Sequence, residues 1–225
     1  MAALTIPQLY NNYQKRVVEV QLKKTFSDFK NAVTLSEVEN GSYYNWDYSL
    51  NSKEFVNKYI APYMHLTPCF GYGQSYGVKD GCFVKKPPFL GFYAYNRDLT
   101  NLSIITDVQT KYLLSDNRAV SFFNGIHDKN KYLEFYVDVN GPKGKSIMGV
   151  DVFHFYLLVG GGRCGGLHLG ASAANYGTWC RGDDNHKMKT CLGQIEIPYP
   201  GASCGYFLEK NDFKFPKDYP LKLKF

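Results

Sequence analysis

A helical pattern without a single glycine runs from Ala2 to Asn40, and it constrains the fold more than any other part of the sequence. Gly41 follows it, and glycine is the residue that most often ends a helix in the left-handed conformation. At about 1.5 Å per residue such a helix is roughly 55–60 Å long, more than a domain of this size needs. We therefore predict an element that reaches beyond its own domain. Its apolar residues recur every three or four positions and line one face, as in an amphipathic helix: Val18, Leu22, Phe26, Phe29 and Val33.

The beginning of this pattern combines two unusual motifs. Residues 2–7, AALTIP, are apolar and end in a proline, and the polar residues Asn11, Tyr13, Gln14 and Lys15 follow them. A second segment, LKKTFS, stands at 22–27. Residues 2–40 thus resemble the N-terminal helix of type IV pilins and of type II secretion pseudopilins. In that family a short basic leader and a membrane-spanning apolar helix precede such a stretch.

The resemblance implies a function and a set of partners. The chain is expected to be a structural subunit, minor or specialised, of a type IV pilus or a type II secretion pseudopilus. The apolar face of the helix, together with Glu19, is expected to contact the helices of other copies or of other pilins. The inner-membrane assembly machinery is a further expected partner.

The resemblance also implies a location. We expect a leader and a membrane segment before Ala2, in the place where Met1 stands here, so that the full-length form is anchored in the inner membrane. Its globular part would then be periplasmic or extracellular, or displayed on a cell-surface filament. The sequence itself contains no run of about 18 apolar residues that would span a bilayer. The alternative is a complete cytosolic protein whose helix packs on its own core.

Beyond the helix, the pattern predicts one globular domain at 41–225 and assigns 1–40 to the assembly helix. Hydrophobic residues make up 44% and charged residues 20%, which is typical of a folded domain rather than of a disordered chain. Runs of β-branched and aromatic residues predict antiparallel strands at 102–108, 119–126, 131–139 and 151–159. The predicted class is therefore α+β: a long helix packed on an antiparallel sheet, as in pilins, with loops closed by disulfides.

Six cysteines, all after residue 68, favour disulfides and an oxidising compartment. Many connectivities exist for six cysteines. We expect three pairs: Cys69 with Cys82, Cys164 with Cys204, and Cys180 with Cys191. Zinc bound by Cys164 and His168 is the alternative, but the spacings match no common zinc pattern.

The segment from Asp138 to Asp151 contains the densest group of oxygen ligands. Asp138 and Asn140 alternate at the end of a predicted strand, so their side chains point to the same side, and Asp151 returns at the start of the next strand. Such ligands on a folded-back loop suit Ca²⁺, and pilin-like proteins resembling this one carry similar hairpins. No cofactor is required, and calcium is the candidate. The alternative, which we prefer, is that these side chains accept hydrogen bonds from the loop as Asx turns.

The C-terminal tail alternates lysines with aromatic residues and suggests a second function. Cations among rings are typical of proteins that bind single-stranded nucleic acid. Lys214, Lys217, Lys222 and Lys224 are the candidate contacts. A filament that displays a binding module for DNA or a surface ligand, through this tail and the Cys164–Cys204 loops, is therefore the alternative function. The interpretation that we prefer for the tail itself is a last edge strand with its lysines outward.

An enzyme is not expected. The five histidines, at 65, 127, 154, 168 and 186, are scattered, and the sequence contains no G-x-S-x-G, H-E-x-x-H or P-loop motif. The net charge of +6 permits contact with anionic surfaces without requiring it.

Overall fold

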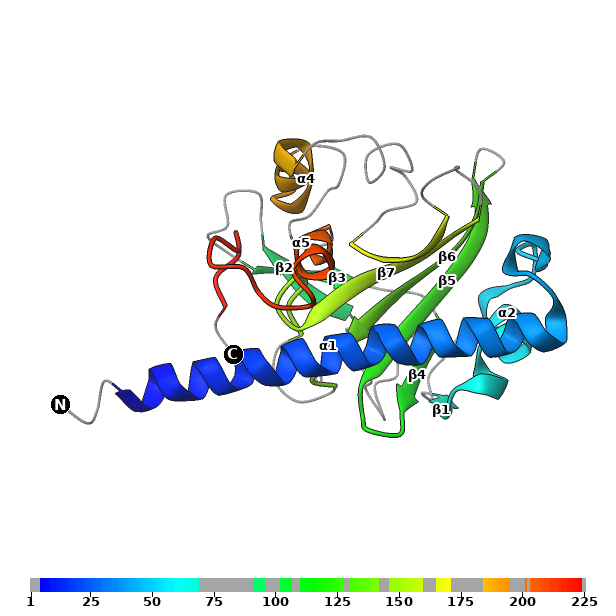
Figure 1. Cartoon of the computed structure of the whole chain (residues 1–225), viewed down its shortest axis with the longest axis horizontal. Coiled ribbons are helices and arrows are strands. Elements are labelled where there is room, and N and C mark those ends of the chain that lie inside the picture. Colours follow the sequence, from blue (N-terminus) through cyan, green and yellow to red (C-terminus); the bar gives the residue numbers. More distant parts are fainter. Residues whose placement is uncertain are drawn as a thin grey trace.

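In the computed structural model, a long helix lies across one face of an antiparallel sheet (Figure 1). The residues that the structure describes are 5–68, 91–95, 102–106, 110–127, 130–141, 146–159, 165–170, 184–194, 201 and 203–223. The expected α+β class, with a long N-terminal helix on an antiparallel sheet, is confirmed for this part of the chain.

The helix α1 spans Thr5–Asn40, which confirms the predicted element apart from its first residues. Gly41 follows with φ of +72°, the left-handed conformation that glycine adopts without a steric penalty. Figure 1 shows that the N-terminal part of α1 extends past the sheet. Averaged over its whole length, α1 is slightly hydrophilic. No helix among the described residues is long and apolar enough to cross a membrane.

The main sheet has six strands in the order β1-β4-β5-β6-β7-β8, and every neighbouring pair is antiparallel. Its centre is a meander in which each strand pairs with the next one along the chain, as the sequence predicted. The strands are β1 (Leu66–Pro68), β4 (Thr110–Leu114), β5 (Ala119–His127), β6 (Asn130–Asp138), β7 (Val152–Val159) and β8 (Gly166–Leu169).

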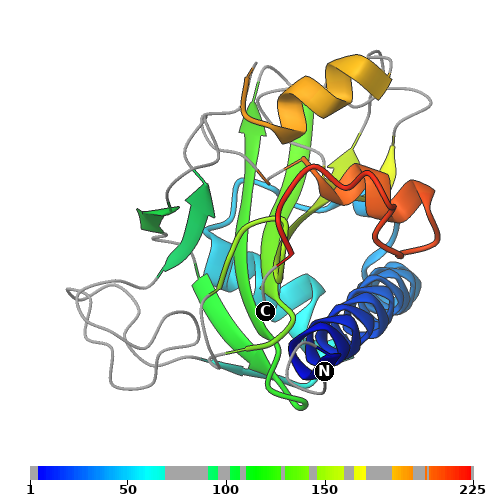
Figure 2. The same cartoon turned by 90° about the vertical axis from the view of Figure 1, so that its left-hand side faces the viewer.

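Three of the predicted strands are β5, β6 and β7. The fourth, predicted at 102–108, is β3 (Leu102–Thr106), and it is not part of the main sheet. It pairs with β2 (Gly91–Tyr95) in a separate two-stranded sheet. Figure 2 shows this small sheet on the other side of the large sheet from α1. Strands β4 and β8 were missed because each has only four or five residues, too few for a clear alternation.

The hydrophobic core lies between α1 and the main sheet. Phe29 of α1 is at its centre, with its ring 4.1 Å from that of Phe135, 5.7 Å from Phe122 and 6.4 Å from Phe155, measured between centroids. These residues alternate with outward-facing neighbours on β5, β6 and β7, as a sheet with one face on a helix requires. Burial of each such ring stabilises the fold by about 1.5–3 kcal/mol.

Short helices complete the described structure. Helix α2 (Ser52–Tyr59) begins where the side chain of Asn51 accepts a hydrogen bond from the backbone N–H of Glu54, and it packs near β5. Trp46 stacks on Tyr59 and closes that end of the core. The remaining helices are the 3₁₀ turns η2 (Tyr43–Asn45) and η3 (Ala61–Tyr63), and then α4 (Asp184–Cys191) and α5 (Gly205–Lys210).

Candidate functional site

The apolar face that we expected to join copies of the helix is occupied by the chain's own core. Val18, Leu22, Phe29 and Val33 are buried, and Phe26 is half-buried against the ring of Phe213. The expectation that this face packs against other helices therefore needs correction, because the main sheet and the tail already cover it. A contact between copies would have to use another side of α1.

Glu19, expected to be an intersubunit contact, also has a partner within the chain. Its Oε1 accepts a hydrogen bond of 2.9 Å from the backbone N–H of Phe215. Asn11 donates to the carbonyl of Leu223 over 3.1 Å, and Lys23 forms an ion pair of 2.7 Å with Asp212. The C-terminal segment 211–223 therefore runs along the N-terminal half of α1, in the opposite direction.

The prediction of a final edge strand is wrong for this segment. Residues 211–223 contain no strand, and β8 forms that edge of the main sheet. The alternation that suggested a strand arises because Phe215 is buried against α1 while Lys214, Lys217 and Lys222 are exposed. The pattern of inward rings and outward cations thus serves an irregular segment on a helix. Lys224 lies outside the described residues.

A second apolar stripe lies on the solvent side of α1. Because a helix turns about 100° per residue, its five members fall within roughly 80° of one another, opposite the side that faces the sheet. Single exposed apolar residues are common, but an aligned set on one helix is typical of an interaction surface. We call these residues the outer stripe: Leu9 (74% exposed), Tyr13 (62%), Val20 (67%), Leu35 (53%) and Val38 (80%).

The sequence contained the signal for this outer stripe. Leu9, Tyr13 and Val20 repeat at a helical spacing half a turn out of phase with the buried face. This repeat is weaker than the one from Val18 to Val33, because polar residues interrupt it between Val20 and Leu35.

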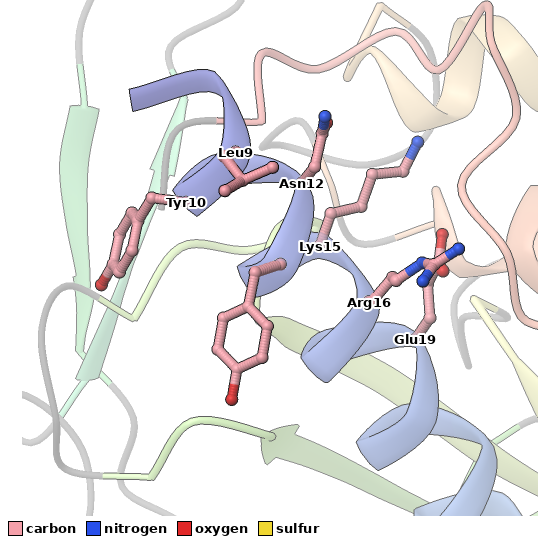
Figure 3. Close-up of a pocket in the computed structure, with 7 residues that line it drawn as sticks. Leu9, Tyr10, Asn12, Lys15, Arg16 and Glu19 are labelled. Atoms are coloured by element: carbon pink, nitrogen blue, oxygen red, sulfur yellow. The ribbon is translucent and has the colours of Figure 1, made fainter. Parts of the chain in front are cut away.

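An open depression of about 810 Å³ borders the N-terminal half of the outer stripe. Figure 3 shows the ring of Tyr10 on one side of the helix, with Asn12 and Lys15 on the other. The aromatic, cationic and amide groups of this depression can contact apolar surface and carboxylates together. Its described lining is Leu9, Tyr10, Asn12, Tyr13, Lys15, Arg16 and Glu19.

A buried arginine fixes α1 to the sheet. Arg118 is 1% exposed and stands between β4 and β5, immediately before Ala119. Its guanidinium forms ion pairs with Asp116 and Asp28, with N···O distances of 2.5–3.0 Å. It also donates to the hydroxyl of Thr25 on α1. Burial raises the pKa of Asp116, but the Arg118 and Lys24 cations outweigh it and hold that pKa at about 2. This network joins the middle of α1 to the edge of the sheet and fixes which side of α1 faces solvent.

The structure brings the three candidate calcium ligands together at the β6–β7 end. Asp138 Oδ1 accepts from the backbone N–H of Asn140 at 3.0 Å, and Asp151 Oδ2 accepts from Asn140 Nδ2 at 3.3 Å. The remaining two carboxylate oxygens accept from the hydroxyl of Ser146 and the backbone N–H of Ile147. The hydrogen bonding that we preferred is confirmed for Asp138 and Asp151, which accept from the loop, whereas the side chain of Asn140 donates instead of accepting. A cation would have to displace these donors. Among the described residues, no cluster of three or more His, Cys, Asp or Glu side chains suits a metal ion.

Burial governs the ionisation of this carboxyl pair. Asp138 and Asp151 are both buried. Burial and the neighbouring charge of Asp151 raise the pKa of Asp138 well above its ordinary value. Burial raises the pKa of Asp151 to about 7. The pair is thus able to hold protons in the neutral range without a metal.

A second buried polar group lies on the sheet face away from α1. His154 Nε2 on β7 is 2.7 Å from Glu134 Oε1 on β6, and the hydroxyl of Tyr136 donates to the same carboxylate at 2.8 Å. The Tyr136 and His154 rings stack with centroids 4.4 Å apart. Burial raises the pKa of Glu134, but the charge and hydrogen bond of His154 outweigh it, so that pKa lies below its usual value. This contact joins two central strands, and Nδ1 of the buried His154 has no hydrogen-bond partner among the described residues.

The observed disulfide corrects the predicted pairing. Cys191, at the end of α4, is bonded to Cys204, immediately before α5. The predicted pairs Cys180–Cys191 and Cys164–Cys204 are therefore wrong. Gly201 links the backbones of the two cysteines, because its N–H donates to Cys191 O and its carbonyl accepts from Cys204 N–H. Cys69, Cys82, Cys164 and Cys180 lie outside the described residues.

Comparison with known families gives one match. A family of unknown function, DUF6613, matches residues 8–223. The chain belongs to this family. The match includes α1, the main sheet and the C-terminal segment that lies along α1. No curated protein and no solved structure matches the chain.

Proposed function

We propose that this chain is a structural subunit of a type IV pilus or type II secretion pseudopilus, and that it assembles through α1. The observation that carries the proposal is the outer stripe, five exposed apolar residues aligned on the solvent side of a 36-residue helix. The resemblance of residues 2–40 to the pilin helix supports it independently. A helix that only covered its own sheet would need apolar residues on one side, and α1 carries five more on its solvent side.

In this proposal the two sides of α1 have different roles. The inner face, with Phe29 at its centre, holds the globular part, and the Arg118 network prevents the helix from turning about its axis. The outer stripe is then presented in a fixed orientation to a neighbouring helix. Helices pack through such apolar rows at separations of about 8–10 Å. As part of the same proposal, a membrane segment ahead of α1 anchors the subunit before assembly, and the inner-membrane machinery inserts it into the filament.

Sedimentation equilibrium between 10 µM and 1 mM tests this proposal. We expect the wild-type chain to associate as its concentration rises, because the outer stripe removes apolar surface from water. A variant with Leu9→Ser, Tyr13→Ser and Val38→Ser should remain monomeric with an unchanged circular dichroism spectrum. Phe123→Ser with Ile126→Ser is the matched control, since both side chains are exposed apolar residues of β5 rather than of α1. A monomeric wild type at 1 mM, or equal loss of association in the control, would refute the proposal.

The alternative function, a filament-displayed module that binds DNA or a surface ligand, keeps only part of its support. The exposed lysines of the tail can attract phosphates, but Phe215 is buried against α1 and offers no ring for a base to stack on. Much of the Cys164–Cys204 region lies outside the described residues. Filter binding to single-stranded DNA in a salt series tests it: a steep loss of affinity with salt supports binding through phosphates, and absence of binding at low salt excludes it.

A further inference from the structure

The two ends of the outer stripe carry opposite charge. We call residues 9–24 of α1 the basic end and residues 35–39 the acidic end. The basic end contains four cations and one carboxylate, and the acidic end contains two carboxylates and no cation. Apolar stripe residues are present at both ends, so each end combines apolar residues with a net charge, positive at one end and negative at the other.

The charges that matter here are those without an ionic partner. At the basic end, Lys23 and Lys24 are paired with Asp212 and Asp116. Lys15 lies over the ring of Phe215, and Arg16 is exposed; neither forms an ion pair with a described residue.

At the acidic end, Glu37 and Glu39 accept hydrogen bonds only from neutral groups. Their donors are Ser42, the backbone of Tyr43, and the hydroxyl of Tyr63. Within the described residues no cation neutralises either carboxylate. Charge of each sign is thus left over at opposite ends of one helix.

The position of these carboxylates is unfavourable for the helix itself. The last turn of a helix favours cations, because its unpaired carbonyls carry a partial negative charge. The last turn of α1 has no basic residue and contains Glu39 instead. Glu39 gains the hydrogen bond from Tyr63 in this position. A carboxylate that breaks the local rule for a helix end is also expected where a residue serves a contact outside its own fold.

We propose that the acidic end of α1 in one copy docks against the basic end of α1 in the next copy. This inference rests on the proposed function and specifies the contact by which it operates. Val38 and Leu35 pack against Leu9 and Tyr13, while the exposed Glu39 approaches the exposed Arg16. Lys15 takes no part in this contact, because it lies over Phe215 on the inner side of α1. Arg16 and Glu39 are 23 positions apart, roughly 35 Å along the axis, so copies joined in this way are staggered by that distance.

This arrangement differs from a symmetric dimer in a measurable way. Two copies that met through the same end would bring like charges together, which opposes association. A contact between two different surfaces leaves one unused surface on each terminal copy, so association continues instead of stopping at two. An open-ended filament requires a contact of this kind.

Charge reversal in the full chain tests the inference. Arg16→Glu alone and Glu39→Lys alone should each weaken association about tenfold, measured by sedimentation equilibrium, because each places like charges in the contact. The double variant should recover most of the wild-type affinity, since the two reversed charges again face each other across copies. Glu54→Lys is the matched control; it reverses an exposed charge on α2, outside the contact, and should leave the affinity unchanged.

The outcomes separate this inference from the proposed function. Association that stops at a dimer, or that strengthens in Arg16→Glu, would show pairing through the same end and overturn the inference while leaving self-association through α1 intact. A double variant no tighter than either single variant would also overturn it. A wild-type chain that never associates would refute the proposed function itself.

Discussion

The buried carboxyl pair at the β6–β7 end makes the stability of the protein depend on pH. The folded-state pKa of Asp151 is about 7, against an ordinary value of 3.8. Between these values the folded state binds a proton that the unfolded state has released. The free energy of unfolding therefore falls as pH rises from about 4 to 7, at roughly 1.4 kcal/mol per pH unit.

The size of the effect follows from the same two pKa values. A difference of about three units corresponds to roughly 4 kcal/mol, present below pH 4 and lost once the pH exceeds 7. Asp151→Asn removes the titrating group and keeps an oxygen that accepts from Ile147 N–H. Rearranging the Asn140 hydrogen bond should cost this variant about 1 kcal/mol at every pH. We therefore expect it to be slightly less stable than the wild type at pH 5, and more stable at pH 8, where the wild type has lost the stabilisation from protonated Asp151.

Urea unfolding at pH 5, 6, 7 and 8, followed by circular dichroism, measures this difference. Asp138→Asn is the matched variant, because its side chain amide can donate to the Ser146 hydroxyl as a protonated carboxyl would. It should shift the titration of Asp151 to lower pH by removing the neighbouring acid. A wild-type stability that does not change with pH, or an Asp151→Asn variant that is equally destabilised at pH 5 and 8, would refute the reasoning.

The same assay tests whether calcium binds, because a bound ion would raise the stability of the folded state at pH 8. An ion bound by Asp138, Asn140 and Asp151 would stabilise the folded state at pH 8 in proportion to the logarithm of its concentration. Each of the four carboxylate oxygens already accepts a hydrogen bond that a cation would compete with, so we expect no stabilisation by 5 mM CaCl₂ and no loss on adding EDTA. A calcium-dependent rise in stability that Asp151→Asn abolishes would establish the metal site.

Three further changes test the core, the buried arginine and the disulfide. Phe29→Ala should destabilise the protein by about 3–5 kcal/mol in urea, since it removes the ring at the centre of the core, whereas Val38→Ala on the solvent side of the same helix should change stability by less than about 0.5 kcal/mol; equal effects would contradict the assignment of the two faces. Arg118→Met should cost about 3 kcal/mol, because Asp116 and Asp28 then keep only the half-exposed Lys24 as a described cationic partner. The loss should shrink as the pH falls from about 4 to 2, the range in which the stabilisation from ionised Asp116 disappears. Replacing Cys191 and Cys204 together by serine should lower the free energy of unfolding in urea by about 3 kcal/mol, the value for a closed loop of this length.

The strong periodicities of the sequence predicted most of the fold. The repeat from Val18 to Val33 located α1 and its inner face, and the aromatic runs located β5, β6 and β7, because burial on one face imposes those spacings directly. Gly41 was sufficient to place the end of the helix. Short edge strands such as β8 were missed because four residues carry too little pattern, and β3 was placed in the wrong sheet because spacing does not specify a strand's partner.

The site was harder to predict than the fold. The sequence correctly grouped Asp138, Asn140 and Asp151, since a hairpin brings them together, but cysteine pairing depends on the path of intervening loops. The apolar face of α1 was recognised, yet its partner was not, because periodicity shows that a face is buried without showing by what. Only the structure shows that the sheet covers the inner face and that the outer stripe remains exposed.

The most direct test of assembly through α1 is a residue-resolved one. Two-dimensional ¹H–¹⁵N NMR spectra of the labelled chain, recorded from 20 µM to 1 mM, report which backbone amides change environment on association. The account predicts concentration-dependent shifts or broadening at Leu9, Tyr13, Val20, Leu35 and Val38, with the β5 amides of Phe123 and Ile126 unaffected. Changes centred on β5 or another surface, or no change up to 1 mM, would contradict it.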